Sequence, residues 1–399
     1  MNKACLLLLV AGCVEHTDAV TGTQSIQVEL VSPSATGDVD NRLDDSARAI
    51  RINLRALNAD GELDTGFDQP VRVYAQFLGT LTPDLNQMPL ATVPMSGGVG
   101  MGAQVMLPPV FGPTTVWVDN GTGLGTDYQH GPLGGTSDTL WFRDPFISDL
   151  QRPRDEMAVD ALSKTPLTDK QISVSASRHG AAGRLVVTST FAQGYTIADV
   201  QCGAGGAPPC TAGDYDHVMV FTFSAPRDNH GSPLEVGQSV QRFTGGLTEF
   251  NGLTEIGFPR TFIPQAEGEP PDINRARLPA PKLFDVSWFG PLSNPDGMIN
   301  FERNEAGPIE IRGAKVCDMD ADFDTYKQWK LDPTGVGGRC TGRRNVLNVI
   351  TAGTDFTTDP RTLAGRTLPR VVGIVRPVNI GSFNVWIIYP RGADDISLQ

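Results

Sequence analysis

Short runs of alternating apolar and polar residues, each ended by glycine, proline or asparagine, dominate this chain and favour β structure. The pattern is clearest at the C-terminal end, in residues 308–399. Alternation of this kind turns one face of each strand toward a core, and five such strands in succession predict a small barrel. The predicted strands cover residues 309–316, 326–331, 345–351, 369–375 and 383–389.

Glycine and proline interrupt the alternating runs throughout the sequence. There are 44 Gly and 30 Pro among 399 residues, and long helical periodicity is scarce. At about 100–200 residues per domain, the length predicts two to four domains. We therefore predict an all-β protein in which a β-sandwich is followed by two five-stranded barrels.

Residues 26–145 contain the strands of the predicted sandwich. The runs at 50–57 and 71–77 alternate well, and Asp60-Gly61 between them is a strong turn signal. A later run at 114–118 continues the pattern. This layout resembles a bacterial immunoglobulin-like domain, although no Cys–Trp–Cys core is present. The resemblance implies a spacer or a binding surface.

The first residues have the layout of an export signal. A basic start and the apolar residues 4–10 lead into Val10-Ala-Gly-Cys13. This sequence resembles the lipobox of bacterial lipoproteins. The resemblance implies that residues 1–12 are a signal peptide, that Cys13 is lipidated and that residues 13–25 are a tether. We therefore predict an exported protein anchored by its lipid to the outer membrane or cell surface; a plain signal peptide is the alternative.

Four of the six cysteines lie beyond the predicted signal peptide and lipidation site. They form two local pairs, Cys202–Cys210 and Cys317–Cys340, each within one predicted barrel. An oxidising compartment favours a disulfide in each pair. A four-thiolate metal site is the alternative, but the chain lacks the C-x2-C spacing typical of zinc sites.

Residues 176–277, after a predicted linker over 146–175, contain a second set of strands. Two motifs are Gly194-Tyr-Thr-Ile-Ala-Asp199 and Val236-Gly-Gln-Ser-Val240. Both resemble segments of the OB-fold-like accessory modules of secreted bacterial nucleases. The chain departs from those modules by inserting the loop between Cys202 and Cys210.

A second copy follows a predicted linker over 278–307. Residues 308–399 repeat this order of strands. Leu368-Pro-Arg-Val-Val-Gly373 and the segment 385–396 lie at the positions of later strands in that order. The resemblance implies two OB-like barrels after the immunoglobulin-like sandwich. It implies no activity, because the catalytic domain of those nucleases has no counterpart here and a fold does not determine function.

Catalytic motifs are absent from the sequence. The five histidines are scattered, and no HExxH, G-x-S-x-G or Walker motif occurs. We therefore predict a protein that is not an enzyme and has no cofactor. An unrecognised hydrolase is an alternative.

One segment has ligands for a metal ion: Asp318-Met-Asp320-Ala-Asp322-Phe-Asp324. Alternate carboxylates suit calcium, which takes six to eight oxygen ligands. The segment lacks the central glycine of an EF-hand loop. The alternative, which we favour, is a solvated acidic loop beside the disulfide, with Phe323 and Tyr326 packed on the barrel.

OB folds bind oligonucleotides or oligosaccharides on the face of their second and third strands. Aromatic side chains beside cations suit either ligand. Trp329 and Trp386 are expected in the core. In the second barrel, the candidate ligand-binding residues are therefore Tyr326, Arg339, Arg343, Arg344 and Tyr389.

The charge balance disfavours nucleic acid as the partner. The net charge is −13, and residues 308–399 hold only 12 Lys and Arg against 10 Asp and Glu. We therefore predict a binding or scaffold protein that is attached to a membrane through its lipid and whose partner is a protein or a polysaccharide. Capture of single-stranded nucleic acid by the second barrel is the alternative.

Overall fold

The computed structural model of the chain describes residues 22–79, 88–121, 133–153, 156, 167–291, 294–380 and 383–398. Strands make up 43% and helices 12%, which confirms the predicted all-β class. The chain divides into two compact units: the first ends at Phe142, and the second comprises Arg143–Gln399 and residues 77–84. The predicted signal peptide and Cys13 lie outside the described residues. None of the described helices has the length and apolar character needed to cross a bilayer.

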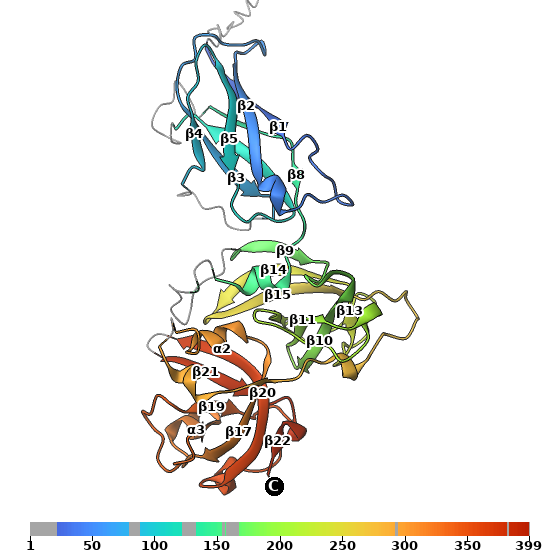
Figure 1. Cartoon of the computed structure of the whole chain (residues 1–399), viewed down its shortest axis with the longest axis vertical. Helices are drawn as coiled ribbons and strands as arrows, with labels where there is room; N and C mark the ends of the chain where they lie inside the picture. Colours follow the sequence, from blue (N-terminus) through green and yellow to red (C-terminus); the bar gives the residue numbers. More distant parts are fainter. Residues whose placement is uncertain are drawn as a thin grey trace, which may run out of the picture. The chain divides into compact units, whose positions relative to one another are not determined.

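The first unit is a β-sandwich, drawn in blue to green in Figure 1. One sheet has the strand order β1-β2-β5, and the other has the order β4-β3-β6-β7, with β8 also paired to β6. The strands are β1 (Ser25–Ser32), β2 (Ala49–Leu57), β3 (Val71–Phe77), β4 (Ala91–Val93), β5 (Val99–Met106), β6 (Pro113–Asp119), β7 (Gly134–Thr136) and β8 (Leu140–Trp141), and a 3-10 helix, η1 (Asp45–Arg48), precedes β2.

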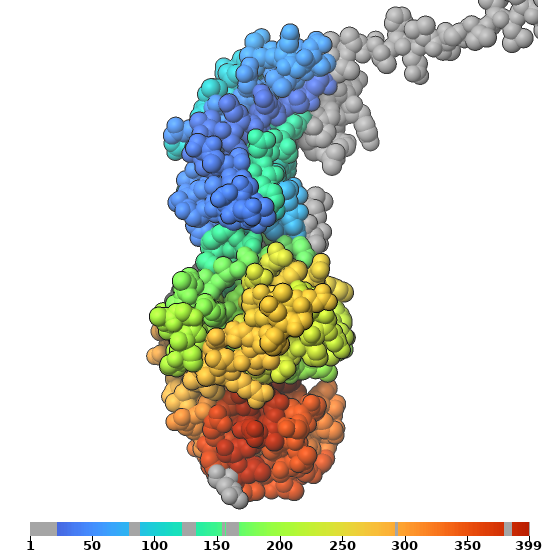
Figure 2. Space-filling model, turned by 90° about the vertical axis from the view of Figure 1, so that its right-hand side faces the viewer, coloured from blue at the N-terminus to red at the C-terminus, as the bar shows by residue number. Residues whose placement is uncertain are grey.

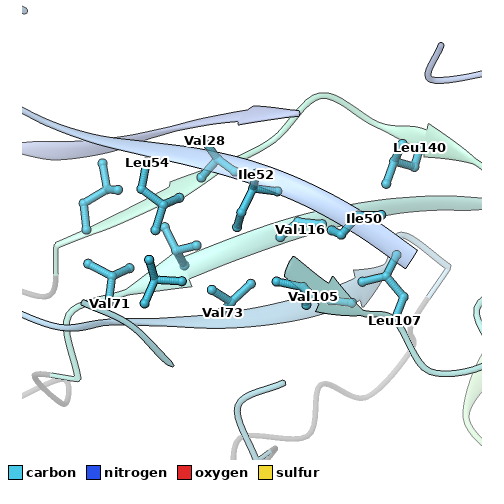
Figure 3. Close-up of a cluster of buried hydrophobic side chains, with 14 of the residues drawn as sticks. Val28, Ile50, Ile52, Leu54, Val71, Val73, Val105, Leu107, Val116 and Leu140 are labelled. Carbon is cyan, nitrogen blue, oxygen red and sulfur yellow. The ribbon is translucent and has the colours of Figure 1, made fainter. Parts of the chain in front are cut away.

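Alternation along the strands places the apolar side chains of this unit between its two sheets. In β2, Ile52 and Leu54 are buried, whereas Arg51 and Arg55 are exposed. Figure 3 shows side chains of β2 meeting those of β3, β5 and β6 in a single core. The sequence therefore predicted β2, β3 and β6 and their inward faces correctly.

The second unit contains two barrels. The first is built from β10 (Gly183–Phe191), β11 (Gly194–Gln201), β12 (His217–Phe221), β13 (Ser239–Val240), β14 (Arg242–Phe250) and β15 (Leu253–Phe262). One residue separates β13 from β14, so the two act as one strand. Because β13 pairs with β10, the circuit β10-β11-β12-β15-β14/β13 closes as a five-stranded barrel. β12 and β15 run parallel and the other neighbours antiparallel.

The second barrel has the same strand order. β17 pairs with both β18 and β20, and β19 runs parallel to β21, so the circuit β17-β18-β19-β21-β20 also closes. This is the arrangement that the OB-like resemblance implied. The strands are β17 (Pro308–Val316), β18 (Gln328–Asp332), β19 (Leu347–Ile350), β20 (Thr367–Ile380) and β21 (Phe383–Tyr389), and two edge strands extend the sheet: β16 (Lys282–Leu283) and β22 (Ile396–Ser397).

The segment over residues 146–175, which was predicted as a linker, instead adds a helix and a strand to the first barrel. It contains helix α1 (Ile147–Gln151) and strand β9 (Lys170–Val174), and β9 pairs with β14. The side-chain amide of Gln151 donates to the carbonyl oxygen of His217 at 2.7 Å, which ties α1 to β12. The remaining helices are α2 (Ile299–Arg303), α3 (Ala321–Tyr326) and the 3-10 turns η2 (Gly180–Ala182), η3 (Ala204–Gly206), η4 (Arg275–Arg277), η5 (Val286–Phe289), η6 (Pro360–Leu363) and η7 (Ala393–Asp395).

Both predicted disulfides are confirmed. Cys202–Cys210 closes part of the loop between β11 and β12. Cys317–Cys340 joins the end of β17 to the loop between β18 and β19. All four residues are buried, so each bridge belongs to the packed interior of its own barrel.

The two barrels share one unit and adjoin in Figure 2, where the first is drawn in green to yellow and the second in orange to red. Buried polar groups around Glu305 and His217 connect them, and we call this contact the joint. The carboxylate of Glu305 accepts from the backbone amide of Thr254 at 2.9 Å. Burial raises the pKa of Glu305 well above its ordinary value, and the charge of Glu302 adds to the effect. Gly307 packs on the ring of His217, and a Cβ there would lie 2.5 Å from a ring carbon. Burial also lowers the pKa of His217 to about 4.

The lowered pKa of His217 predicts how the stability of the fold changes with pH. Its folded-state pKa lies below the unfolded value of about 6.5, so the folded state binds fewer protons between about pH 4 and pH 6.5. The stability that the neutral imidazole contributes is therefore present above pH 6.5 and is lost as the pH falls through this window, by up to about 3 kcal/mol. We expect His217→Gln to remove this part of the pH dependence in chemical denaturation measured at several pH values.

His230→Gln is the matched control, because it removes a histidine from a loop after β12 rather than from the joint. Its stability should follow the pH profile of the wild-type protein. Equal slopes for His217→Gln and the wild-type protein between pH 4 and pH 6.5 would contradict the account of a histidine buried in its neutral form.

Candidate functional site

The predicted acidic segment forms the start of a helix in the second barrel. Asp320 is the N-cap of α3, and its carboxylate accepts from the backbone amide of Asp322 at 3.2 Å. Asp322 and Asp324 lie in the first turn, where the helix dipole favours negative charge. Local helix formation therefore accounts for much of the alternating acidic pattern.

Lys330, on β18, reaches this segment. Its Nζ lies 2.6 Å from Oδ2 of Asp320 and also contacts the carboxylate of Asp322. Burial alone would raise the pKa of Asp320, but the hydrogen bonds from Lys330 and Thr341 outweigh it and lower that pKa. A buried ammonium group thus already pairs with two of the four carboxylates proposed as calcium ligands. Calcium binding by Asp318, Asp320, Asp322 and Asp324 stays a prediction.

A surface pocket of about 420 Å³ lies beside the same segment. Its lining brings one candidate ligand-binding arginine together with two of the candidate metal-binding carboxylates. A pocket of mixed charge suits a polar ligand that both donates and accepts hydrogen bonds. The lining residues are Asp318, Met319, Asp320, Ala321, Arg339 and Thr341.

Arg343 and Tyr389 are held by partners inside the second barrel. Arg343 donates to Oδ2 of Asp332 at 2.8 Å. Burial would raise the pKa of Asp332, but hydrogen bonds from Thr334, Gly337 and Arg343 together lower it to about 2. The guanidinium carbon of Arg376 lies 4.9 Å from the ring centroid of Tyr389. These contacts give both candidate residues a role in stabilising the barrel.

The other predicted residues of this barrel differ in exposure. Trp329 and Trp386 are buried in the core, as expected. Phe323 is also buried, but Tyr326 is 64% exposed, so the alternative in which both pack on the barrel was right only for Phe323. Tyr326, Arg339 and Arg344 are exposed, and in the described part of the chain no ring contact or ion pair joins them.

A stronger candidate lies on the first barrel: the aromatic patch of Phe221, Phe223 and Phe258. Phe221 ends β12, Phe223 follows it, and Phe258 lies on the parallel strand β15. The ring centroids of Phe221 and Phe223 are 4.5 Å apart, and those of Phe223 and Phe258 are 4.7 Å apart. Phe223 is 53% exposed and Phe258 is 81% exposed. The three rings therefore form one apolar surface that is open to solvent.

The two residues with exposed rings in this patch, Phe223 and Phe258, have unusual backbone conformations. Phe223 has a φ of +58° and Phe258 a φ of +50°, both in the left-handed region. Phe258 also lies at an irregularity between β14 and β15. A Cβ on Gly245, opposite it, would come within 2.6 Å of the carbonyl oxygen of Gly257. Bulges of this kind redirect side chains, and here the bulge accompanies an outward-facing ring.

Sequence reasoning missed the aromatic patch. Phe221 and Phe223 belong to a run that reads as an ordinary strand. The one local signal near Phe258 is Pro259, because a proline within a strand marks an edge or a bulge. The irregularity that accompanies the exposed ring of Phe258 follows from the pairing of β14 with β15, which the sequence pattern does not contain.

No protein-family description, no curated protein and no solved structure matches the chain. The resemblance to bacterial lipoproteins and to nuclease accessory modules therefore stays a prediction.

Lys330 generates a prediction for the acidic segment. Because its ammonium group already occupies the space between Asp320 and Asp322, about 5 mM calcium, above the dissociation constants typical of extracellular calcium modules, should not raise the melting temperature of the wild-type protein. We expect Lys330→Met to lose about 1–3 kcal/mol of stability, since it leaves two partly exposed carboxylates without their ammonium partner, a case between surface and buried ion pairs. Calcium should restore part of this loss, as measured by thermal unfolding.

Lys327→Met is the matched control, because Lys327 is exposed and lies just after α3. It should leave stability close to that of the wild-type protein with or without calcium. A calcium-induced rise in the melting temperature of the wild-type protein would contradict this interpretation and support the calcium site.

Proposed function

We propose that this protein is a non-catalytic, exported binding protein whose first barrel holds a polysaccharide on the aromatic patch. The observation that carries the proposal is Phe258, an 81% exposed ring on left-handed backbone in contact with a second such ring. In this proposal the lipid on Cys13 keeps the barrel at the membrane surface. Two disulfides support export, because they persist in oxidising compartments.

The aromatic patch costs stability when nothing covers it. A left-handed conformation costs a residue other than glycine about 1–2 kcal/mol. The rings of Phe223 and Phe258 recover little of this cost, since more than half of each residue stays in water. Strained residues that persist at a surface are typical of ligand sites. A ligand that covers both rings would remove their apolar surface from water, and the contact between the rings already places them side by side.

The chemistry of the patch favours a sugar over a nucleic acid. OB folds bind both oligosaccharides and oligonucleotides. The net charge of −13 disfavours a phosphate backbone, whereas the negative faces of aromatic rings attract the polarised C–H bonds of a sugar. Arg242 and Arg260, whose guanidinium carbons lie 4.3 and 5.3 Å from the ring centroid of Phe262, add donors for sugar hydroxyl groups on β14 and β15.

Phe258→Asn tests the proposal. Asparagine tolerates left-handed backbone, so we expect the melting temperature to stay the same or rise. Retention on the polysaccharide should weaken at least about tenfold, equivalent to about 1.4 kcal/mol, because one stacking ring is lost. The measurement is co-sedimentation with peptidoglycan, chitin and cellulose, together with native electrophoresis through gels that contain soluble polysaccharides.

Phe250→Asn is the matched control, because Phe250 is also exposed, at 60%, but lies at the β14–β15 hairpin outside the patch. It should bind like the wild-type protein. Failure of the wild-type protein to bind any polysaccharide in the panel would contradict the proposal. Retention on single-stranded DNA that falls steeply with salt would instead support nucleic-acid capture.

A further inference from the structure

Three segments of the first barrel bring a histidine and two carboxylates together. His179 precedes β10, Asp199 lies in β11, and Asp216 immediately precedes β12. One ring nitrogen of His179 and one carboxylate oxygen of each aspartate all lie within 4.8 Å of one another. The cluster is separate from the aromatic patch, whose residues lie at the other end of β12 and on β15.

Two atoms of this cluster are buried without a hydrogen-bond partner. Oδ1 of Asp216 and Nε2 of His179 have none among the described residues. Asp216 is 0% exposed, and the side chain of His179 is 18% exposed. A buried carboxylate oxygen without a donor is costly. The structure therefore leaves one oxygen and one nitrogen of the cluster with lone pairs that a metal ion could use.

The other polar atoms around the cluster hold the two carboxylates in position. The backbone amide of Arg178 donates to Asp199 at 2.8 Å, and the hydroxyl of Ser177 also donates to it. The guanidinium of Arg178 and the backbone amide of Gly213 each donate to Oδ2 of Asp216 at 2.7 Å. Outer hydrogen bonds of this kind orient the ligands of metal sites.

The charge of the cluster favours a cation. Two buried carboxylates face one guanidinium group, that of Arg178, so a neutral imidazole leaves an excess of negative charge. A bound cation would be the largest local charge at this site and would offset this excess.

We propose that His179, Asp199 and Asp216 form a binding site for a divalent transition-metal ion of the zinc type. One imidazole nitrogen and two carboxylate oxygens are ligands that zinc accepts, and three protein ligands leave a fourth position for water or another donor. Calcium and magnesium fit less well, because they take oxygen ligands. The ion joins the segment before β10 to β11 and to the segment before β12, and so stabilises this end of the barrel.

Zinc binding to the full, untagged chain tests this site. The protein is stripped with a chelator while its disulfides stay intact, and it is then dialysed against zinc sulfate. We expect one equivalent of bound zinc by elemental analysis, together with a higher melting temperature. His179→Gln should lose both effects, whereas His230→Gln, which removes a histidine outside the cluster, should keep them.

Arg178→Gln is expected to increase zinc binding, and a misfolded variant would not show such a gain. The guanidinium of Arg178 places a positive charge beside the site, and the backbone amide of Gly213 still holds Oδ2 of Asp216 without it, so Arg178→Gln should strengthen zinc binding in the same dialysis. The proposal is overturned if the wild-type chain binds no zinc. It is also overturned if His179→Gln binds zinc as tightly as the wild-type chain, because the ion would then lie elsewhere.

Discussion

Each barrel closes through a short parallel contact between its third and fifth strands. In the first barrel this contact pairs Met219, Val220 and Phe221 with residues 255–257, and in the second it pairs Asn348 and Val349 with residues 387–388. Without this contact, β12 and β15 would each present an edge of unpaired backbone groups, which is a hazard for aggregation. All the other strand pairs of the two circuits are antiparallel.

The positions of the functional candidates follow from this closure. Phe221 belongs to the last residue pair of the parallel contact, and its partner Gly257 directly precedes Phe258. The aromatic patch therefore exists only when β12 and β15 lie side by side. Asp216 lies just before the start of the same strand, so one short strand carries a candidate sugar-binding surface at one end and a candidate metal site at the other.

The sequence predicted the strands well because alternation is a local property. All five strands of the second barrel and both disulfides were found from residue patterns alone. The acidic segment shows where this reasoning ends. Asp320 and Asp322 have the same spacing whether they bind calcium or an ammonium group, and the pattern contained no sign that Lys330 would reach them from β18.

Sites that depend on tertiary pairing were missed for the same reason. His179, Asp199 and Asp216 come from three segments and form no motif in the sequence. The exposure of Phe258 depends on a bulge between β14 and β15, and a strand pattern does not specify where such a bulge falls. Local chemistry therefore predicted the scaffold, whereas the candidate sites required the three-dimensional register.

Residue-resolved hydrogen exchange in the native protein tests barrel closure most directly. If β12 and β15 pair as described, the amides that join residues 219–221 to residues 255–257 will exchange as slowly as those between β10 and β11, through a shared unfolding event. Rapid exchange of the β12–β15 amides, while those between β10 and β11 stay protected, would show an open sheet and would contradict the account.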